Sequence, residues 1–220
     1  MRDRKRAREL ASEYIEKGDP TGWFEVLYRE AEEGKSIVPW ADRGANPGLV
    51  EYWNANPQTT DGKNALVIAC GLGDDAEQLA AWGFATTAFD ISETAIRKAR
   101  TRFPQSEVNY RVADLFRPPE EWERKFDFVF EANTVQALPA QIRAQAMQKI
   151  ASFVGSGGRL LVIVRGREAE EPEGELPWPL TRAELEEFVR SGLAEQSFEN
   201  YFDTEEPPSR RYRVLYIRAG

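Results

Sequence analysis

Two glycines and two acidic residues stand at the ends of three apolar runs in the sequence. Gly71 and Gly73 follow the run ALVIAC, Asp90 ends the next run, and Asp114 follows the third. Glycine lets a backbone turn sharply and approach a ligand closely, because it has no Cβ atom. A carboxylate after a strand can accept hydrogen bonds from both hydroxyls of a ribose. Together these residues predict a nucleoside site; a tight turn and two helix caps are the alternative interpretation.

The residues after the glycine turn distinguish between nucleoside cofactors. The sequence runs GLGDDA, without the third glycine of the dinucleotide pattern G-x-G-x-x-G. Asp74 and Asp75 at the start of a helix suit the helix dipole, but they would repel a diphosphate. S-adenosylmethionine has no phosphate and carries a sulfonium and an ammonium group. The turn therefore favours S-adenosylmethionine over a nicotinamide dinucleotide.

The hydrophobic pattern indicates the elements that would position these residues. Apolar runs such as RLLVIV and FDFVF do not alternate with polar residues, which is typical of buried parallel strands. Strands and helices alternate, which predicts right-handed βαβ units and a doubly wound sheet with ligands beyond the carboxyl ends of its strands. The expected strands are 65–70, 84–89, 108–112, 126–131 and 159–164, and the expected helices between them are 75–82, 93–102 and 139–153.

Both ends of the chain add further elements. They are expected helices at 3–17, 20–33 and 181–190, the last with a capping-box pattern, and an antiparallel pair of strands at 195–202 and 210–218. The region 34–62 has a loop-like composition, but its aromatic residues suggest that it covers something. We predict one domain over 1–220, with an N-terminal helical lid over 1–60 and a Rossmann-like, mostly parallel seven-stranded α/β core over 61–220.

The composition excludes several classes of protein. The 29 basic and 37 acidic residues give a net charge of −8, so we expect no nucleic-acid partner. The absence of histidine excludes Ser-His-Asp and Cys-His mechanisms and His-ligated metals. Cys70 is the single cysteine, which excludes an intramolecular disulfide. No apolar segment approaches the roughly 18 residues that span a bilayer, so we expect no membrane partner and a cytoplasmic protein.

Five motifs follow one another in an order that belongs to a known superfamily. ALVIACGLGDDAEQLA, AFDIS, VADLF, FDFVFEANTVQALP and GSGGRLLVIV resemble the successive strand-end motifs of class I S-adenosylmethionine-dependent methyltransferases. The resemblance covers roughly residues 60–220. It implies S-adenosylmethionine as the cofactor and S-adenosylhomocysteine as the product.

The N-terminal segments narrow the resemblance. WFEVLYREAEEG, IVPWADRGANPGLVEYW and the pattern LP-x-x-x-R ending at Arg143 are similar to the thiopurine S-methyltransferase and halide/thiol methyltransferase group. The resemblance implies an aromatic segment over the cofactor, in which Trp23 and Trp40 would attract the sulfonium by cation–π interaction. Simple packing of the two rings is the alternative. Ala132 stands where thiopurine methyltransferases have an arginine, so the resemblance supports the cofactor and not a thiopurine substrate.

We expect the cofactor to lie across the first four strands. The residues assigned to it are Trp23 and Trp40 in the N-terminal segment, Ala69, Gly71 and Gly73 in the turn, Asp90 and Ile91 at the ribose, Asp114, Leu115 and Phe116 at the adenine, and Glu131 and Asn133 at the methionine end. No residue is assigned to catalysis and none to a metal.

The acceptor is expected to be a small molecule with a thiol or other soft nucleophile. Methyl transfer from a sulfonium needs orientation and exclusion of water more than a strong base. A phenol or an amine usually needs proton removal, and the candidate bases Asp42, Glu131 and Tyr14 stand at no convincing motif. Arg165 and Arg167 either attract an anionic acceptor or pair with the acidic run that follows them.

Other functions stay open at the level of sequence. They are an O- or N-methyltransferase of a small molecule, a non-catalytic S-adenosylmethionine-binding protein, and an NAD-dependent oxidoreductase, against which the missing third glycine speaks. The oligomeric state is also open, a monomer included.

Overall fold

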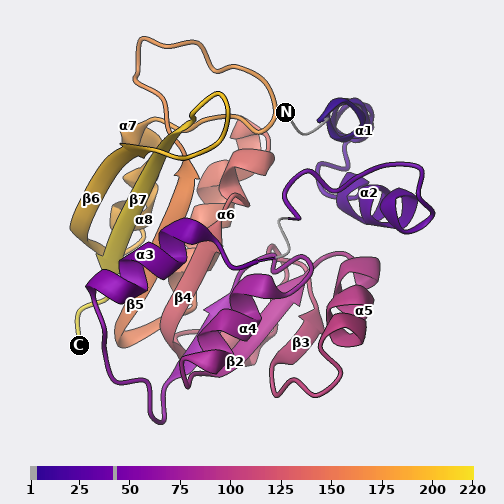
Figure 1. Cartoon of the computed structure of the whole chain (residues 1–220). Coiled ribbons are helices and arrows are strands. Elements are labelled where there is room, and N and C mark those ends of the chain that lie inside the picture. Colours follow the sequence, from indigo (N-terminus) through magenta and orange to yellow (C-terminus); the bar gives the residue numbers. More distant parts are fainter. Residues whose placement is uncertain (1–3, 42–43) are drawn as a thin grey trace.

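Seven strands form one sheet in the spatial order β3-β2-β1-β4-β5-β7-β6 (Figure 1). The structure is a computed structural model that describes residues 4–41 and 44–220. Paired strands among β1 to β5 are parallel, and β7 is antiparallel to both β5 and β6. The strands are β1 (Asn64–Val67), β2 (Ala85–Asp90), β3 (Asn109–Val112), β4 (Phe126–Ala132), β5 (Val154–Arg165), β6 (Ala194–Phe202) and β7 (Arg210–Ile217). The predicted mostly parallel sheet of seven strands is confirmed.

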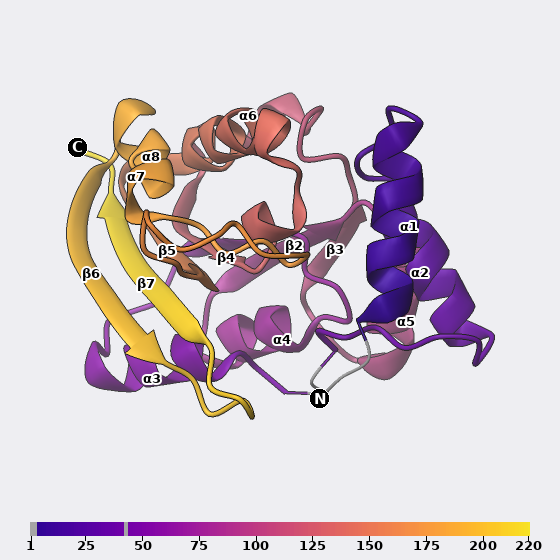
Figure 2. The ribbon, with the colours of Figure 1, turned by 90° about the horizontal axis from the view of Figure 1, so that it is seen from above.

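Helices cover both faces of this sheet, as the view from above shows (Figure 2). Helices α3, α4 and α5 lie on one face, and α6, α7 and α8 lie on the other. The helices are α1 (Lys5–Glu16), α2 (Trp23–Glu32), α3 (Pro47–Ala55), α4 (Asp74–Ala81), α5 (Glu93–Arg102), α6 (Ala140–Ser152), α7 (Arg182–Leu185) and α8 (Glu187–Arg190), with short 3₁₀ helices η1 (Glu120–Trp122) and η2 (Val135–Ala137).

The buried apolar runs supply a core to each face. Phe128 and Phe130 of β4 pack with α3 and α4, whereas Val129 between them packs with α6 and α8. All three side chains are at most 2% exposed. Because successive strand residues point to opposite faces, a strand covered on both sides must be apolar throughout. Burying a side chain of this size contributes roughly 1.5–3 kcal/mol.

The strand order reverses at β1, which pairs with β2 on one side and β4 on the other. Beyond the end of β1 the chain keeps single backbone bonds to both neighbours. Ile68 N–H donates to the Phe130 carbonyl (3.0 Å), and Cys70 N–H donates to the Phe89 carbonyl (2.8 Å). These bonds explain why 65–70 has the pattern of one strand, and they hold the glycine turn at the edge where ligands of such sheets lie.

Helix α3 corrects the expectation that 34–62 is loop-like. The Asn46 side chain accepts a hydrogen bond from Gly48 N–H, and Pro47 occupies the first turn, which is favourable there. Tyr52 and Trp53 are buried against the sheet, and Trp53 stacks on Trp82 with ring centroids 4.8 Å apart. Tyr52 and Trp53 thus cover one face of the sheet.

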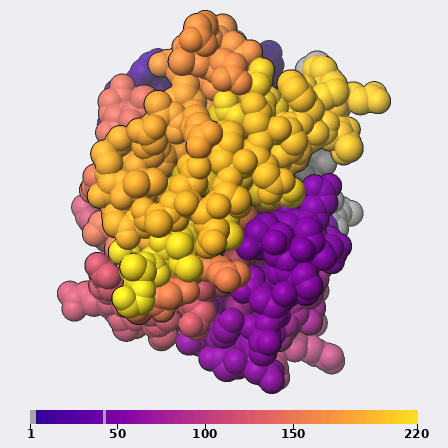
Figure 3. Space-filling view, turned by 90° about the vertical axis from the view of Figure 1, so that its left-hand side faces the viewer, coloured from indigo at the N-terminus to yellow at the C-terminus, as the bar shows by residue number. Residues whose placement is uncertain are grey.

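A side chain of strand β7 binds α3 to the sheet. Arg213 donates to the Gly48 carbonyl (2.9 Å) and pairs with Glu51 (3.2 Å). Figure 3 shows this side of the molecule, where the purple segment around α3 lies directly beside the orange and yellow C-terminal segment. The predicted antiparallel pair at the end of the chain is confirmed, with β7 inserted between β5 and β6.

The expected helix 181–190 and the expected strand 159–164 differ most from their expected forms. The expected helix 181–190 is interrupted at Glu186, between α7 and α8. Its capping box is present, since Thr181 and Glu184 exchange side-chain and backbone hydrogen bonds. Strand β5 begins at Val154, five residues before its expected start at 159, and includes the Gly155–Gly158 segment. A Cβ at Gly158 would lie 2.7 Å from the Phe126 carbonyl oxygen, which explains a glycine inside a strand.

Helix α1 packs on α2, and α2 packs beside α5, away from the faces of the sheet (Figure 2). Trp23 and Leu27 of α2 form a small core with Leu10 of α1 and Leu176 of the loop after β5. The Glu25 carboxylate also accepts bonds at the start of α5, from Ser92 Oγ (2.6 Å) and from Thr94 Oγ1 (2.7 Å) and N–H (3.1 Å).

The division of the chain at residue 60 stays a prediction. Within the described ranges no helix is long and apolar enough to cross a membrane.

Candidate active site

A cavity of about 690 Å³ lies at the carboxyl ends of the central strands. Its wall includes Ala69 after β1, Asp90 at the end of β2, Ala132 at the end of β4 and Arg165 at the end of β5. Helix α2, the loop after β5 and the turn between β6 and β7 supply other parts of the wall. This is the edge at which the sequence predicted a ligand site.

Most of the residues predicted to bind the cofactor line this cavity. Gly71, Gly73 and Glu131 do not. Those that do are Trp23, Trp40, Ala69, Asp90, Ile91, Asp114, Leu115, Phe116 and Asn133. Their contacts with a cofactor stay predictions.

Both the backbone conformation and the packing of the turn require glycine at positions 71 and 73. Gly71 and Gly73 have φ values of 54° and 92°, in the left-handed region that favours glycine. A Cβ at Gly71 would lie 2.8 Å from the Tyr28 hydroxyl, and one at Gly73 would clash with the Tyr110 hydroxyl. The turn therefore brings backbone, rather than side chains, up to Tyr28, which itself lines the cavity.

The two acids after the turn do not face the cavity. Asp74 pairs with Arg102 through both carboxylate oxygens (2.8 Å each), and Asp75 accepts a bond from Asn46 N–H (2.6 Å). Their expected role in selecting the cofactor by direct charge is therefore not supported. They fasten α4 to α5 and to the start of α3.

Asp90 is the buried carboxylate of the cavity wall. It is 5% exposed and accepts bonds from Gly71 N–H and Ser92 N–H, each at 2.9 Å. Burial raises the pKa of Asp90 to about 6, against the effect of these bonds. Each carboxylate oxygen has a further lone pair, so the group can still accept a bond from a ligand.

Asp114 forms a tight turn after β3. Its Oδ1 accepts a bond from Phe116 N–H (2.8 Å), which places Leu115 and Phe116 beside it on the cavity wall. An acceptor oxygen next to two apolar side chains fits the edge and faces of an adenine ring.

Glu131 is enclosed behind the wall and not on it. Its side chain is fully buried, and Oε1 accepts bonds from Thr134 N–H (2.7 Å) and Val135 N–H (3.0 Å). Burial raises the pKa of Glu131 to about 7, and Oε2 has no protein partner. Its contact with the methionine end stays a prediction.

Asn133 lies on the wall in a left-handed conformation, with φ of 65°. Asparagine tolerates this region better than most residues. Its Oδ1 accepts bonds from Gln136 Nε2 and from the Arg211 guanidinium, both at 3.1 Å. The end of β4 is thereby connected to β7.

The N-terminal aromatic residues form one cluster. Trp23 is fully buried and stacks on Phe24 at 3.9 Å between ring centroids, with Trp40 edge-on to both rings. Trp40 Nε1 donates to the Tyr28 hydroxyl (2.9 Å). Packing accounts for Trp23, whereas half-buried Trp40 has the greater freedom to meet a cation.

None of the described candidate bases has access to the cavity. Glu131 is enclosed, and Tyr14 packs with α1 and α2. Asp42 lies outside the described residues. Cys70 packs against the core beside α4, and burial raises the pKa of its thiol, which fits the filler interpretation.

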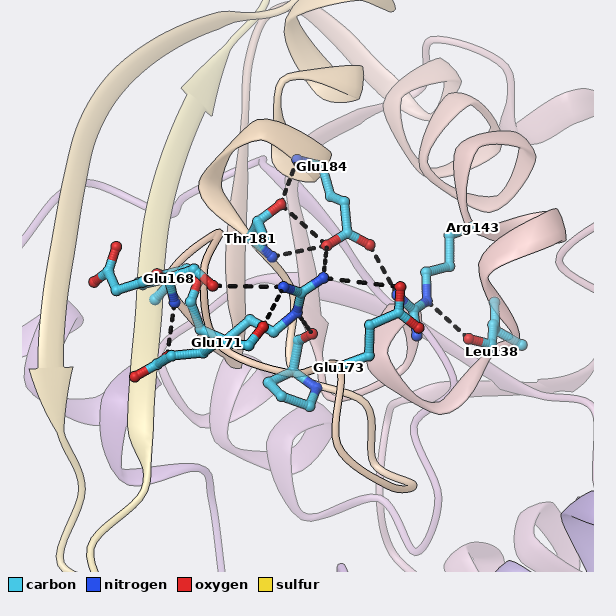
Figure 4. A network of polar contacts seen from close by, with 10 residues as sticks. Leu138, Arg143, Glu168, Glu171, Glu173, Thr181 and Glu184 are labelled. Carbon is cyan, nitrogen blue, oxygen red and sulfur yellow. Dashed lines mark hydrogen bonds and ion pairs between the residues drawn. The ribbon is translucent and has the colours of Figure 1, made fainter.

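Arg167 contacts several groups of the loop after β5, among them Glu168, Glu171 and Glu173, which Figure 4 labels. Its guanidinium donates to the carbonyls of Pro179 (3.3 Å), Glu168 (3.4 Å) and Glu171 (2.9 Å), and lies 3.9 Å from Glu184. Within the acidic run, the Glu173 carboxylate lies 4.0 Å from the guanidinium, so the structure agrees with pairing of Arg167 with this run.

Arg143 of the LP-x-x-x-R pattern belongs to the same network (Figure 4). It donates to the Leu138 carbonyl (2.9 Å) and pairs with Glu184 (2.8 Å). The pattern thus ties the segment after β4 to α7.

Several wall residues were missed by the sequence analysis. They come from α2, the start of α3 and the C-terminal hairpin, namely Tyr28, Asn46, Pro47, Gly48, Tyr201, Phe202, Asp203, Glu205 and Arg211. The pair Arg210-Arg211 beside an acidic turn was the available signal for the last group.

Comparisons with known proteins assign the chain to a family. The family model of thiopurine S-methyltransferase matches residues 32–215. A thiopurine S-methyltransferase of Vibrio atlanticus is 22% identical over 65% of this chain and 71% of its own length. A 2-heptyl-1-hydroxyquinolin-4(1H)-one methyltransferase of Mycobacteroides abscessus is 25% identical over 76% and 74%.

The fold agrees with that assignment. The crystal structure of Burkholderia thailandensis 1,6-didemethyltoxoflavin-N1-methyltransferase, solved with S-adenosylhomocysteine, has a TM-score of 0.70 at 15% identity. The match covers 96% of this chain and 91% of that one. The fold and the family match define an S-adenosylmethionine-dependent methyltransferase. Within that class, the chain belongs to the thiopurine S-methyltransferase family.

Proposed function

We propose that this enzyme methylates a small molecule at a thiol or another soft nucleophile. The proposal rests on two acids, Asp203 and Glu205, that the C-terminal hairpin places on the cavity wall and that arginines hold. Hydrogen bonds from Ser209 and Arg211 outweigh burial and lower the pKa of Asp203, which makes it a poor proton acceptor.

The cofactor residues have separate proposed tasks. Asp90 would accept bonds from the ribose hydroxyls, and Asp114 with Leu115 and Phe116 would hold the adenine. The backbone around Ala69 and the side chain of Asn133 would meet the methionine end. When bound, S-adenosylmethionine supplies a methyl group on a positive sulfur, so the protein has to orient the acceptor and exclude water.

The N-terminal segment would be the lid that excludes water. Ala7 of α1 and Trp23, Phe24 and Tyr28 of α2 contribute to the cavity wall. Arg8 of α1 donates to the Leu176 carbonyl (2.8 Å), which joins this segment to the loop after β5.

An acceptor without sulfur is the second candidate. The Mycobacteroides abscessus relative is named for a hydroxyquinolinone, which contains oxygen and nitrogen but no sulfur. Tyr28 is a phenol on the cavity wall, but burial raises its pKa well above the usual value. The phenol is thus protonated at neutral pH and a weak candidate base.

The test is the release of S-adenosylhomocysteine with a panel of thiols, halides, phenols and amines. We expect release with thiols or halides. Release only with phenols or amines would contradict the soft acceptor while keeping the enzyme class. Asp90→Ala should lose most of the activity at limiting S-adenosylmethionine.

A further inference from the structure

Three arginines from distant segments meet at one carboxylate on the cavity wall. Glu205, in the turn between β6 and β7, lies 2.6 Å from Arg165 of β5 and 3.1 Å from Arg211 of β7. Arg4, just before α1, lies 3.6 Å from the same carboxylate. All four residues line the cavity. The two Glu205 oxygens are shared, since Oε1 faces Arg211 and Oε2 faces the other two arginines.

The arginines are more deeply buried than the acid that pairs with them. The side chains of Arg165 and Arg211 are 17% and 12% exposed, whereas that of Glu205 is 43% exposed. Burial, together with Arg4 and Arg211, lowers the pKa of Arg165. Guanidinium groups removed from water in this way gain strongly from a carboxylate, whose two oxygens match their forked donors.

The two acids of the hairpin differ in how firmly they are held. The Asp203 carboxylate accepts bonds from Ser209 N–H (2.8 Å), Glu205 N–H (3.1 Å) and Arg211 (2.6 Å), so it builds the turn itself. Glu205 extends from an exposed turn, and the contacts described for its carboxylate are those with the three arginines. Glu205 can therefore leave without dismantling the hairpin.

The cluster is joined to the end of β4. Arg211 donates to Asn133 Oδ1 (3.1 Å), and the backbone N–H of Arg165 donates to the Gln136 side chain. Asn133 and Gln136 both line the cavity. A group bound by Arg165 and Arg211 would thus lie within the same cavity as the cofactor and beside the end of β4.

We propose that Arg165 and Arg211 form an anion subsite for an acceptor that carries a carboxylate in addition to its nucleophilic sulfur. Glu205 occupies this subsite in the free protein and is displaced when the acceptor enters. The subsite rests on the proposed function, because it is the acceptor of that reaction that it selects. Arg4 closes the subsite from the N-terminal side.

The test measures binding before turnover. Protein saturated with S-adenosylhomocysteine is titrated by calorimetry with 3-mercaptopropionate and with its methyl ester, which has the same thiol but no charge. We expect the acid to bind at least tenfold more tightly than the ester. Glu205→Gln should raise the affinity for the acid several-fold, because residue 205 no longer carries a charge that competes for the arginines. Arg165→Gln should lower the affinity for the acid tenfold or more. Neither change should alter the affinity for the ester.

The two variants should change the affinity for the acid in opposite directions if Arg165 and Arg211 bind the carboxylate of the acceptor. If Glu205 and Arg165 merely hold the hairpin closed, both variants should change the acid and the ester alike. Arg182→Gln, which removes an exposed arginine paired with Glu195 outside the cavity, is the matched control and should change neither. Equal binding of acid and ester, or no binding of either, would overturn the subsite.

The same titrations test the proposed function and the anion subsite separately. Failure of the wild-type protein to bind S-adenosylhomocysteine would count against the cofactor site and the proposed function. The difference between acid and ester, repeated without S-adenosylhomocysteine, would still decide the subsite.

Discussion

The carboxylate of Asp90 joins the glycine turn to the start of α5 and also faces the cavity. We expect Asp90→Ala to weaken S-adenosylhomocysteine binding by tenfold or more, through the loss of charge-assisted bonds of about 1.5–3 kcal/mol. Calorimetry measures the effect, and Asp61→Ala, at an exposed acid before β1, is the control. Unchanged affinity in a folded Asp90→Ala protein would refute the ribose assignment.

The raised pKa of Asp90 gives cofactor binding a pH dependence. Its free-state pKa is about 6, and a ribose hydroxyl donates best to the ionised form. Binding should lower the pKa and release a proton, so affinity should rise as the pH increases from about 5 to 7 and level off above. Calorimetry in a pH series measures this, with Asp90→Asn as the control. An affinity that falls over this range would contradict the assignment.

At the scale of elements, Glu25 fastens α2 to α5 at a point two residues beyond Asp90. Glu25→Ala removes three hydrogen bonds, so we expect faster hydrogen–deuterium exchange across residues 23–32 and a several-fold loss of S-adenosylhomocysteine affinity. Glu32→Ala on the same helix is the control. It breaks only an exposed pair with Arg97, which contributes little. Equal exchange in the two variants would mean that apolar packing alone holds α2.

The elements differ in how well the sequence predicts them. Continuous apolar runs predicted the parallel strands, because strands covered on both faces have no other suitable composition. Helix α3 was missed because Asn46-Pro47-Gly48 has the composition of a turn, although the same residues form a helix start. The sequence locates the end of β4 but not the direction of each side chain there, so it did not predict that Glu131 is enclosed behind the cavity wall. Asn133, two residues later, has a left-handed backbone and lies on the wall.

At the scale of the whole molecule, the cavity was less predictable than the sheet. The edge that holds it follows from the strand order, and the acids after β2 and β3 follow from the motifs. The cluster around Glu205 unites residues 4, 165, 205 and 211, and no local pattern relates positions so far apart. Such a cluster becomes visible only when β7 is placed between β5 and β6.

The free energy of unfolding should depend on pH because of the enclosed Glu131. Its pKa rises from 4.5 to about 7 on folding, so protonation favours the folded state. The corresponding stability is fully present below pH 4.5 and is lost as the pH rises through 7. The free energy of unfolding of the wild-type protein should fall between about pH 5 and 8. In Glu131→Gln, whose side chain at this position does not titrate, this fall should be smaller by roughly 2 kcal/mol. Urea unfolding at the two pH values measures it, with exposed Glu107→Gln as the control. An unchanged difference would place the titration elsewhere.

The position of β7 also sets an order of assembly. During synthesis β6 emerges before β7, yet the partner with which it pairs is β7, and β7 supplies the outer partner of β5. Until residues 210–217 leave the ribosome, the nascent sheet therefore ends in an open edge at β5, the kind of edge on which other chains can add. The strand that brings Arg211 to the cavity is the one that covers this edge, so the cavity wall and the pairing of β5 are completed in a single step.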